Sequence, residues 1–581
     1  MAVGIGAVMG SSHEKGVDVL VVGAGIAGTT AALAASTQGA RVCMASVGTT
    51  FSGASFYGGT WGLGLVGPDG DGDEDDLVAT ILRVGGNVAD PTLVRTLVHG
   101  IAPAAERLER LGVTLRRPAA GHGDEQAYVP CFDHRHRCWR GIERGPYRAS
   151  VARGLRAGEV TLLEGCELVD LAEADGHICG AVLYDAGSGR FRTVACGAVV
   201  LAAGGLSGLY QQRLCAPDVT GAVHAIALRH GCSLVNVEFL QMMPTIVSPR
   251  PGIVFNEKSF GYVDGRSAGL SRDLLAERGR YGPFSARLAS RSVDFAIASA
   301  GRWGMEVRYG TLPDRLPEFV RSYSAWLSAQ GVDPMGPLRI THYAHASNGG
   351  IAIDARGRCR GGARGLFACG EMAGGMHGAD RLGGLSSANC LVYGEIAGRE
   401  AAREALGTSW ASRAWRHPDA HAPGRKLPST QAMVPADAEA MEGELRDTMS
   451  RWCMVRRDAE GLSRARRRLD GLAERATAGL VGAGGAARAA DAVVTAEGTL
   501  TAGVGEVAGA PHDVARAMRL RLRLDSARAM VAAMSARQES RGAHYRSDSP
   551  HEVAELATAH VVTLDAGGNP EVRASGEDVR D

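Results

Sequence analysis

One short segment constrains the fold of this chain more than any other: the sequence Gly-Ala-Gly-Ile-Ala-Gly at 23–28. An apolar, β-branched run at 17–22 precedes it and is typical of a buried parallel strand. Small apolar residues at 26–38 follow and predict a helix, and 41–45 predict a second strand. This order of strand, glycine turn, helix and strand predicts a Rossmann-like α/β domain that binds a dinucleotide.

Each glycine of this motif has its own physical role. Gly23 permits a tight turn, Gly25 lets the backbone approach a pyrophosphate, and Gly28 lets the helix pack against the strand. The phosphates then lie at the positive end of the helix. The acidic residue that usually ends the second strand is missing, and Ser46 is the nearest polar group. The motif alone therefore fits both NAD and FAD.

Composition excludes several classes of partner. The 581 residues include 63 basic and 63 acidic ones, so we expect no nucleic-acid partner, which would need a basic face. No apolar run reaches the roughly 18 residues of a membrane helix, and we expect no membrane partner. The twelve cysteines are scattered and form no CxxC pair. That pattern favours reduced thiols in a cytoplasmic protein and no metal site.

Two segments carry metal-ligand residue types without the spacing of a metal site. An EF-hand loop that starts at Asp69 would need glycine sixth and glutamate twelfth, where Glu74 and Thr80 stand. We therefore predict a solvated loop at 67–76. The segment Cys-Phe-Asp-His-Arg-His-Arg-Cys at 131–138 is too local to converge on one ion. For it we expect a metal-free active-site loop or a basic surface loop.

Four segments, in order along the chain, resemble one family. They are the glycine motif with Ser-Phe-Tyr-Gly-Gly at 55–59, the stretch 200–245, the stretch 345–395 and the stretch 539–550. The third contains a Gly-Glu pair and an Arg-Leu-Gly-Gly-x-Ser element. Together these segments resemble the flavoprotein subunits of succinate dehydrogenase and fumarate reductase, and their stand-alone relative L-aspartate oxidase.

The resemblance implies FAD as the cofactor. It implies that Glu371 hydrogen-bonds the FAD ribose, and that the helix after Ser386 points its N-terminus at the pyrimidine side of the flavin. Membrane-complex relatives link FAD to a histidine, and 52–57 contain none, so we expect non-covalent FAD. The predicted cofactor-binding residues are Gly23, Gly25, Ala27, Gly28, Ser46, Ser52, Gly58, Gly59, Ala203, Gly204, Gly370, Glu371, Arg381, Ser386 and Ser387.

The same resemblance implies the chemistry. Family members oxidise or reduce a C–C or C–N bond beside a carboxylate, with hydride passing to or from flavin N5 and an arginine moving the proton. Arg291 matches that arginine, and His345 and Arg381 match groups that bind substrate carboxylate. Glu257 falls where the family keeps a threonine–glutamate pair. His342 competes with His345 for the histidine position, but its spacing to the following Gly-Gly is wrong.

Several positions depart from the family pattern. Met243 stands before Pro-Thr where relatives carry a substrate-binding histidine, and Asn256 replaces a threonine. The Arg-Gly-Glu-Gly stretch is absent, and Ser292 replaces the acid that follows the family arginine. Ala222 stands where relatives often keep an acidic FAD contact. Because methionine removes a donor and adds apolar surface, we expect a substrate with one carboxylate and a less polar far end.

We therefore predict an α/β fold: a Rossmann-like FAD-binding domain, an inserted α+β capping domain and a C-terminal helical domain. The predicted parts are an N-terminal extension at 1–16, a discontinuous FAD-binding domain at 17–245 and 340–407, a capping domain at 246–339, a linker at 408–432, the helical domain at 433–545 with a glycine break at 479–485, and an extended tail at 546–581.

The leading hypothesis is an FAD-dependent oxidoreductase resembling L-aspartate oxidase, which oxidises an amino acid or related carboxylic acid with Arg291 as proton-transfer residue. One alternative is a fumarate-reductase-type enoate reductase or dehydrogenase that acts on a non-dicarboxylate substrate. Another is a flavin-binding, non-catalytic partner subunit, which the methionine at 243 keeps open. The only partner we expect besides a small-molecule substrate is a second copy in a homodimer.

Overall fold

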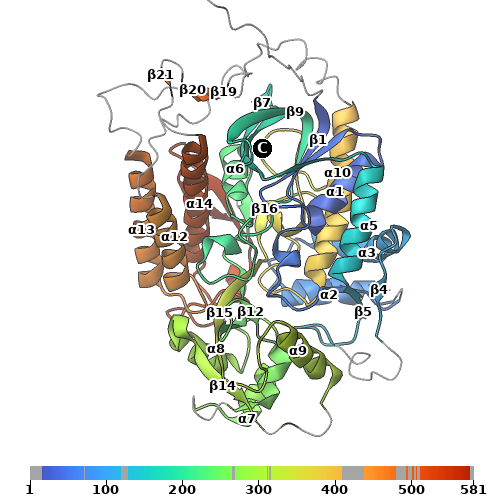
Figure 1. The fold of residues 1–581 in the computed structure, drawn as a ribbon. Coiled ribbons are helices and arrows are strands. Elements are labelled where there is room, and N and C mark those ends of the chain that lie inside the picture. The colour runs from blue at the N-terminus through green and yellow to red at the C-terminus, as the bar shows by residue number, and fades with distance from the viewer. Residues whose placement is uncertain are drawn as a thin grey trace, which may run out of the picture.

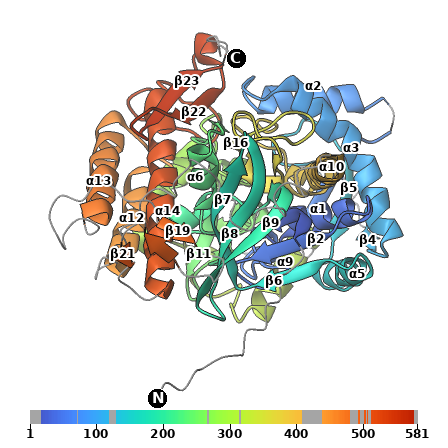
Figure 2. The same ribbon diagram turned by 90° about the horizontal axis from the view of Figure 1, so that it is seen from above.

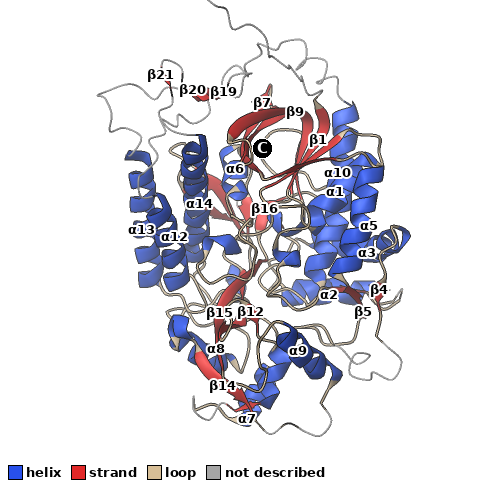
Figure 3. Cartoon of the chain, in the orientation of Figure 1, coloured by secondary structure: helices blue, strands red, loops and turns tan. Residues whose placement is uncertain are grey.

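The computed structural model describes residues 16–70, 72–118, 129–264, 269–310, 312, 316–407, 438–478, 492–494, 500–502, 505–506 and 511–575. Figure 1 shows an α/β part on the right, a smaller part below and a group of long helices on the left. Strands run down the middle, between two groups of helices (Figure 3). The predicted extension at 1–16 (Gly16 excepted), the linker at 408–432 and the glycine break at 479–485 lie outside the described residues.

A seven-stranded sheet forms the core of the α/β part and confirms the predicted Rossmann-like arrangement. Its parallel strands are β6 (Thr161–Glu164), β2 (Val42–Ser46), β1 (Val17–Val22), β9 (Arg190–Leu201) and β17 (Leu366–Ala368). The strand β9 is long enough to pair with β1 and β17 along 196–201 and with the antiparallel β8 along 190–195. The antiparallel pair β8 (His177–Asp185) and β7 (Cys166–Ala174) completes the sheet.

Two parallel helices, α1 (Ile26–Ser36) and α10 (Leu385–Gly407), pack together beside this sheet. Glycine makes the contact close, because a Cβ added at Gly398 would lie 2.2 Å from the Ala31 carbonyl oxygen. One turn earlier, a Cβ at Gly394 would lie 2.8 Å from that of Ala27. The two contacts advance in the same direction along both helices, so their N-termini point the same way.

Further helices and a small sheet surround this pair. The helices are α2 (Glu74–Val84), α3 (Pro91–Arg110) and α5 (Arg144–Ala157), and the sheet consists of β3 (Gly64–Gly67), β5 (Cys138–Ile142) and β4 (Leu115–Arg116).

The acidic segment 67–76 corrects the prediction of a solvated loop. Asp69 is exposed, but Asp73 is only 3% exposed and pairs with the fully buried guanidinium of Arg137. The same guanidinium contacts Asp133 at 3.0 Å and Asp76 at 2.5 Å. The two segments with metal-ligand residue types therefore bind each other through an ion network. Within the described part of the chain, no group of three or more such residues has metal-binding geometry.

The lower part of Figure 1 is built on a long antiparallel ribbon, β11 (Leu240–Ser248) with β15 (Leu338–Ser347). Both strands cross the predicted boundaries at 245/246 and 339/340, so one ribbon belongs to the α/β part and to the cap. The rest of the cap consists of β12 (Ile253–Val254), β13 (Val263–Asp264), β14 (Met305–Tyr309), α7 (Arg272–Arg278), α8 (Arg291–Ser299) and α9 (Glu318–Ala329).

Three long helices form most of the described C-terminal part: α12 (Ala438–Trp452), α13 (Ala459–Ala478) and α14 (Pro511–Ala536). The segment predicted as an extended tail instead forms a hairpin of β22 (His560–Leu564) and β23 (Pro570–Ala574). The strand β22 adds to the edge of β10 (Leu234–Val235), in a sheet with β16 (Gly350–Ala352) and β18 (Ala373–Gly374). Figure 2 shows the hairpin of β22 and β23 near β16. Backbone pairing thus brings this hairpin back to the α/β part.

Buried arginines fasten this C-terminal segment in place. Arg537 is 1% exposed and binds Glu238 at 2.8 Å and Glu539 at 2.9 Å. Arg541 binds Glu539 at 2.7 Å and donates to the Gly86 carbonyl at 2.7 Å. Because a buried charge is tolerated only with partners, these contacts fix how the segment docks on the rest of the molecule.

The other short elements are α6 (Val223–Arg229), β19 (Ala492–Val494), β20 (Leu500–Ala502), β21 (Gly505–Glu506), and the single-turn or two-turn helices η1 (Ala54–Phe56), η2 (Ser207–Leu209), η3 (Glu257–Tyr262), η5 (Gly301–Trp303), η6 (Gly370–Met372) and η7 (Ala554–Leu556). Among the helices that the structure describes, none has the length and apolarity of a membrane span.

A buried histidine gives the fold a testable pH dependence. His230 contacts Asp170 through Nε2 at 2.7 Å and Glu173 through Nδ1. Burial alone would lower the pKa of His230, but the two carboxylates raise it from 6.5 to about 9. We expect the contacts of protonated His230 to stabilise the fold fully below pH 6.5, and this stabilisation to be lost as the pH rises through about 9.

The measurement is urea unfolding of the wild type and His230→Gln between acidic and alkaline pH. The difference in free energy of unfolding should shrink by on the order of 2 kcal/mol across this range. A difference that does not change with pH would contradict the assignment.

Candidate cofactor pocket and adjoining substrate site

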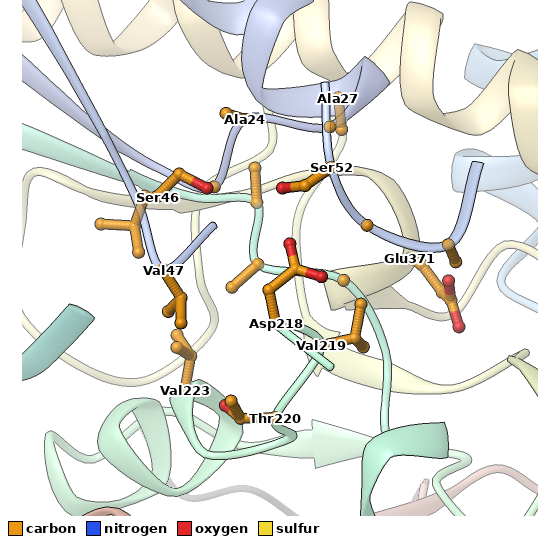
Figure 4. A pocket seen from close by; sticks show the side chains of 18 of the residues that line it. Ala24, Ala27, Ser46, Val47, Ser52, Asp218, Val219, Thr220, Val223 and Glu371 are labelled. Carbon is orange, nitrogen blue, oxygen red and sulfur yellow. The ribbon is translucent and has the colours of Figure 1, made fainter. Parts of the chain in front are cut away.

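A pocket of about 800 Å³, measured with its open mouth, lies at the carboxyl ends of β1, β2 and β9. Ligands of open α/β sheets bind at this edge. Figure 4 shows the carboxylates of Asp218 and Glu371 and the hydroxyls of Ser46 and Ser52 among its lining. The predicted cofactor-binding residues that line it are Gly23, Gly25, Ala27, Ser46, Ser52, Ala203, Gly204 and Glu371.

The N-terminus of α1 opens into this pocket. Its N-cap is Gly25, and no side chain caps the first backbone N–H groups of the helix. Such a helix end binds phosphate through these N–H groups and through the helix dipole. Gly23 has a φ of +112°, and a Cβ there would lie 2.2 Å from the Ala202 carbonyl oxygen. The residues present therefore fit the pyrophosphate of a dinucleotide.

Two carboxylates give the pocket acceptors for hydroxyl groups. Glu371 follows β17, and its Oε1 accepts a hydrogen bond from the Ser347 backbone N–H at 2.9 Å. Gly205 makes room for it, since a Cβ there would lie 2.1 Å from that oxygen. Burial raises the pKa of Glu371, and the Ser347 N–H and Arg381 oppose this. In the described structure Asp218 Oδ1 is buried without a hydrogen-bond partner, so it too has an acceptor to offer.

The other predicted cofactor-binding residues lie around the pocket rather than on its lining. Gly28 lies behind the turn and Gly59 lies against Gly252 of the cap, where added Cβ atoms would each meet a backbone oxygen at 1.9 Å. Gly370 faces Ala27. Gly58 precedes Gly59, Ser386 and Ser387 lie in the first turn of α10, and Arg381 precedes that turn.

A second cluster of polar groups adjoins the pocket. Arg381 donates to Gln241 Oε1 at 2.6 Å, and its Nε is buried without a partner among the described residues. Burial lowers the pKa of Arg381, and Glu371 opposes this, so the cluster interacts electrostatically with the pocket. Burial, with a smaller effect of Arg381, lowers the pKa of His345 to about 3. His345 is therefore a neutral imidazole beside a cation, and its buried Nδ1 also has no partner in the described structure.

Cys131 interacts electrostatically with Arg381, and Glu257 of the cap lies next to Cys131. The Cys131 thiol accepts a hydrogen bond from the Gly282 N–H at 2.8 Å. A Cβ built at Gly282 would lie 3.3 Å from that sulfur and 4.0 Å from the Glu257 carboxyl carbon. Burial, and then Glu257, raises the pKa of Cys131 to about 12, so the thiol is neutral. Of the two expectations for 131–138, this contact favours the active-site loop.

Arg291 is not joined to this cluster by any contact described for it. It begins α8, and its guanidinium donates to the carbonyls of Ala286 and Leu288 at 3.2 and 3.4 Å. One turn later Asp294 is fully buried and binds His342 and Arg278. His342, the competing candidate for the substrate histidine, therefore has a partner on the cap.

The ribbon places Met243 beside the polar cluster. Its strands pair Met243 with Tyr343, while Met242 and Ala344 point to the other face and are fully buried. Side chains alternate along a strand, so Met243 shares a face with Gln241, and its cross-strand partner Tyr343 lies on that face too. The register shifts between the Leu240–Ser347 and Met242–Ala344 pairs, so His345 lies in a β-bulge opposite Gln241. Burial raises the pKa of the Tyr343 phenol. This face thus carries charge-binding groups at one end and neutral ones at the other.

The geometry defines a dinucleotide-binding α/β protein, and comparisons with known proteins identify the dinucleotide as FAD. The family described as FAD binding domain matches residues 18–387, and the fumarate reductase flavoprotein C-terminal family matches 503–581. This chain belongs to the flavoprotein family of succinate dehydrogenase, fumarate reductase and L-aspartate oxidase. It is therefore an FAD-dependent oxidoreductase.

Curated relatives match along nearly the whole chain. One subunit of the CoM/CoB fumarate reductase of Methanothermobacter marburgensis is 26% identical, over 92% of this chain and 94% of that protein. L-aspartate oxidase of Streptomyces coelicolor is 30% identical, over 91% and 88%. Among solved structures, E. coli quinol fumarate reductase FrdA aligns with a TM-score of 0.72 at 22% identity, covering 96% of each chain. Mycobacterium smegmatis Sdh1 gives 0.72 at 23%, over 96% and 93%.

Three residues of the two sites were missed by the sequence analysis: Asp218, Gln241 and Tyr343. The first follows a proline in a segment without strand or helix pattern, so no motif marked it. Gln241 is two residues from Met243, and Tyr343 is two residues from His345. This spacing could have been used as a signal once the ribbon was known.

The contact between Gly28 and Gly23 should decide whether the pocket forms. A Cβ at Gly28 would lie 1.9 Å from the Gly23 carbonyl oxygen, and no side-chain rotation can relieve a clash of Cβ with backbone. We expect Gly28→Ala to destabilise the protein by about 3 kcal/mol and to weaken FAD binding. Gly145, in the first turn of α5 with open space around its Cα, is the matched control.

Gly145→Ala should leave stability unchanged or raise it by up to about 1 kcal/mol. Thermal unfolding and titration of the apoprotein with FAD measure both variants. Equal FAD affinities and melting temperatures would contradict the packing argument.

Proposed function

We propose that this chain oxidises an amino acid or related carboxylic acid that carries one carboxylate near the reacting carbon. The carrying observation is Arg381, a half-buried cation whose buried Nε has no partner among the described groups, next to the neutral imidazole of His345. Arg381 offers a fixed fork of donors, and neutral His345 can add a hydrogen bond. Such a pair is suited to a carboxylate.

The proposed roles follow from this placement. Bound FAD supplies hydride acceptance at its N5 atom. Arg381 and His345 hold the carboxylate, and Gln241 holds Arg381 in place. Arg291, at the start of α8, is proposed to move the accompanying proton, for which its guanidinium must leave the Ala286 and Leu288 carbonyls. Glu257 is proposed to bind a cationic or hydrogen-bonding group of the substrate near Cys131.

The far end of the substrate is proposed to be uncharged. Met243 and Tyr343 share the face that carries Gln241, and neither offers a positive charge. A second carboxylate there would lose its hydration without gaining a cation, which is costly. This supports a monocarboxylate over the dicarboxylate that a family histidine at this position would bind.

The similarity of this chain to proteins named L-aspartate oxidase supports oxidation as the direction. Its similarity to a protein named fumarate reductase supports the alternative, reduction of an activated alkene, on the same residues. We also propose a small-molecule substrate and a reducing compartment such as the cytoplasm. Twelve cysteines without disulfides support the second point.

Anaerobic bleaching of the holoenzyme flavin tests the proposed reaction. A panel of amino acids and carboxylic acids should contain a monocarboxylate with a neutral far end that bleaches the flavin faster than L-aspartate or succinate does. Arg381→Lys should lower kcat/KM for it about 100-fold, because lysine lacks the fork geometry. The exposed Arg403→Lys is the control and should have no effect.

Met243→His adds the missing donor and should raise the activity on succinate or L-aspartate. Bleaching by these dicarboxylates at a higher rate than by any monocarboxylate would overturn the substrate assignment. Rapid reoxidation of the reduced enzyme by an activated alkene, with no bleaching by any acid, would favour the reductase alternative.

FAD is proposed to be held without a covalent bond. The stretch 52–57 contains no histidine, and the described lining of the pocket includes none. Precipitation of the holoenzyme with trichloroacetic acid should therefore release all of the flavin into the supernatant. A pellet that keeps flavin fluorescence after washing would disprove this.

A further inference from the structure

Three buried polar side chains, from α7, α8 and β15, contact one another. Arg278, the last residue of α7, donates to the Asp294 carboxylate of α8 through Nε at 2.7 Å and through Nη2 at 2.9 Å. His342 of β15 contacts the same carboxylate through Nε2 at 2.8 Å. Arg278 and Asp294 are fully buried, and His342 is 2% exposed. The function proposed above assigns no role to any of them.

The charges in this cluster are settled by its geometry. Burial alone would raise the pKa of Asp294, but Arg278 and His342 bring it below its ordinary value. An ionised carboxylate only accepts hydrogen bonds, so His342 Nε2 donates. His342 Nδ1 is buried and has no partner in the described structure. The cluster is thus an ion pair with a third hydrogen-bond donor.

Each member of the cluster is close in sequence, or hydrogen-bonded, to a group near the substrate site. Asp294 lies one turn after Arg291 on α8. His342 lies three residues before His345 on β15, and on the opposite face of the ribbon. Arg278 also donates to the Tyr281 and Gly282 carbonyls at 2.5 and 3.0 Å. The Gly282 N–H in turn holds the Cys131 thiol.

Stability alone gives no reason for a carboxylate at this position. The neighbours of Asp294 on the buried face of α8 are Val293 and Ile297, and the core around them is apolar. Removing two charges from water offsets most of their attraction, and apolar residues of similar size stabilise a core as well or better. What the ion pair adds is direction: two fixed donors permit one orientation of α8 relative to α7 and β15.

We propose that Asp294 is a positioning residue, whose carboxylate orients Arg291 and the 281–282 loop relative to His345 on the ribbon. The proposal rests on the proposed function, in which Arg291 moves the proton while Arg381 and His345 hold the carboxylate. Loss of Asp294 therefore slows the proton-coupled step and spares substrate binding.

The test compares Asp294→Asn with the wild type in rapid anaerobic mixing with the most active acid of the panel. The limiting rate of flavin bleaching should fall at least about tenfold, because a misplacement of about 1 Å can cost about 100-fold. The acid concentration that gives half of that rate should stay within a factor of two. Asp525→Asn, which removes the ion pair of α14 with Arg229 outside the site, should change neither value.

Hydrogen exchange of the same proteins provides a readout that needs no substrate. Amides of 279–295 should exchange faster in Asp294→Asn and at the wild-type rate in Asp525→Asn. A wild-type bleaching rate in Asp294→Asn, even with a lower melting temperature, would overturn the proposal while leaving the proposed function standing. If no acid bleaches the wild type, the proposed function fails, and unchanged exchange in Asp294→Asn would then overturn the positioning role as well.

If Asp294→Asn does not yield holoenzyme, His342→Leu takes its place. It keeps the Arg278–Asp294 pair and removes one donor, so the limiting rate should fall several-fold with the half-saturating concentration again unchanged. An unchanged limiting rate in a folded His342→Leu holoenzyme would count against the proposal.

Discussion

Close backbone contact between α1 and its surroundings is the constraint on which the rest of this structure depends. Gly28 lies on the Gly23 carbonyl at a distance that excludes any Cβ, and Gly398 lies in the same way on Ala31. These contacts let α1 pack closely against the turn after β1 and let α10 pack closely against α1. As a result two helix N-termini point toward one edge of the sheet, where the pocket lies. The anion-binding character of that edge follows from backbone alone.

The ribbon of β11 and β15 then adds a second site to the first. It begins in the α/β part, with Gln241 and His345 facing Arg381, and continues into the cap. One face of the ribbon therefore carries Gln241 and His345 beside Arg381, while the other face meets α8 through His342 and Asp294. This explains why groups that bind substrate and groups that position the cap alternate along the same two strands. The buried Arg537 and Arg541 bind Glu238 and Glu539, and these ion pairs dock the C-terminal segment on the rest of the molecule.

Much of the fold could be predicted from local pattern. The strand, turn and helix at 17–36 needed only apolar periodicity and the glycine spacing, and the helices after 438 needed only composition. The hairpin at 560–574 was missed, although Asp-Ala-Gly-Gly-Asn after the β-branched run at 561–563 is a turn signal. The acidic segment was misjudged because Asp73 is neutralised by Arg137, which lies 64 residues away along the chain. An ion pair between residues so far apart along the chain produces no periodic pattern in the sequence.

The sequence by itself determined the nucleotide-binding architecture and the residue types available for chemistry, because turns, strands and helices are set by neighbours within a few positions. Only the tertiary structure decided which of those residues meet. It brought His345 and Gln241 beside Arg381, placed Glu257 beside Cys131, and gave Arg291 and His342 partners of their own. The reason is physical: burial and charge pairing depend on distances in space, and those follow from the packing of the whole chain.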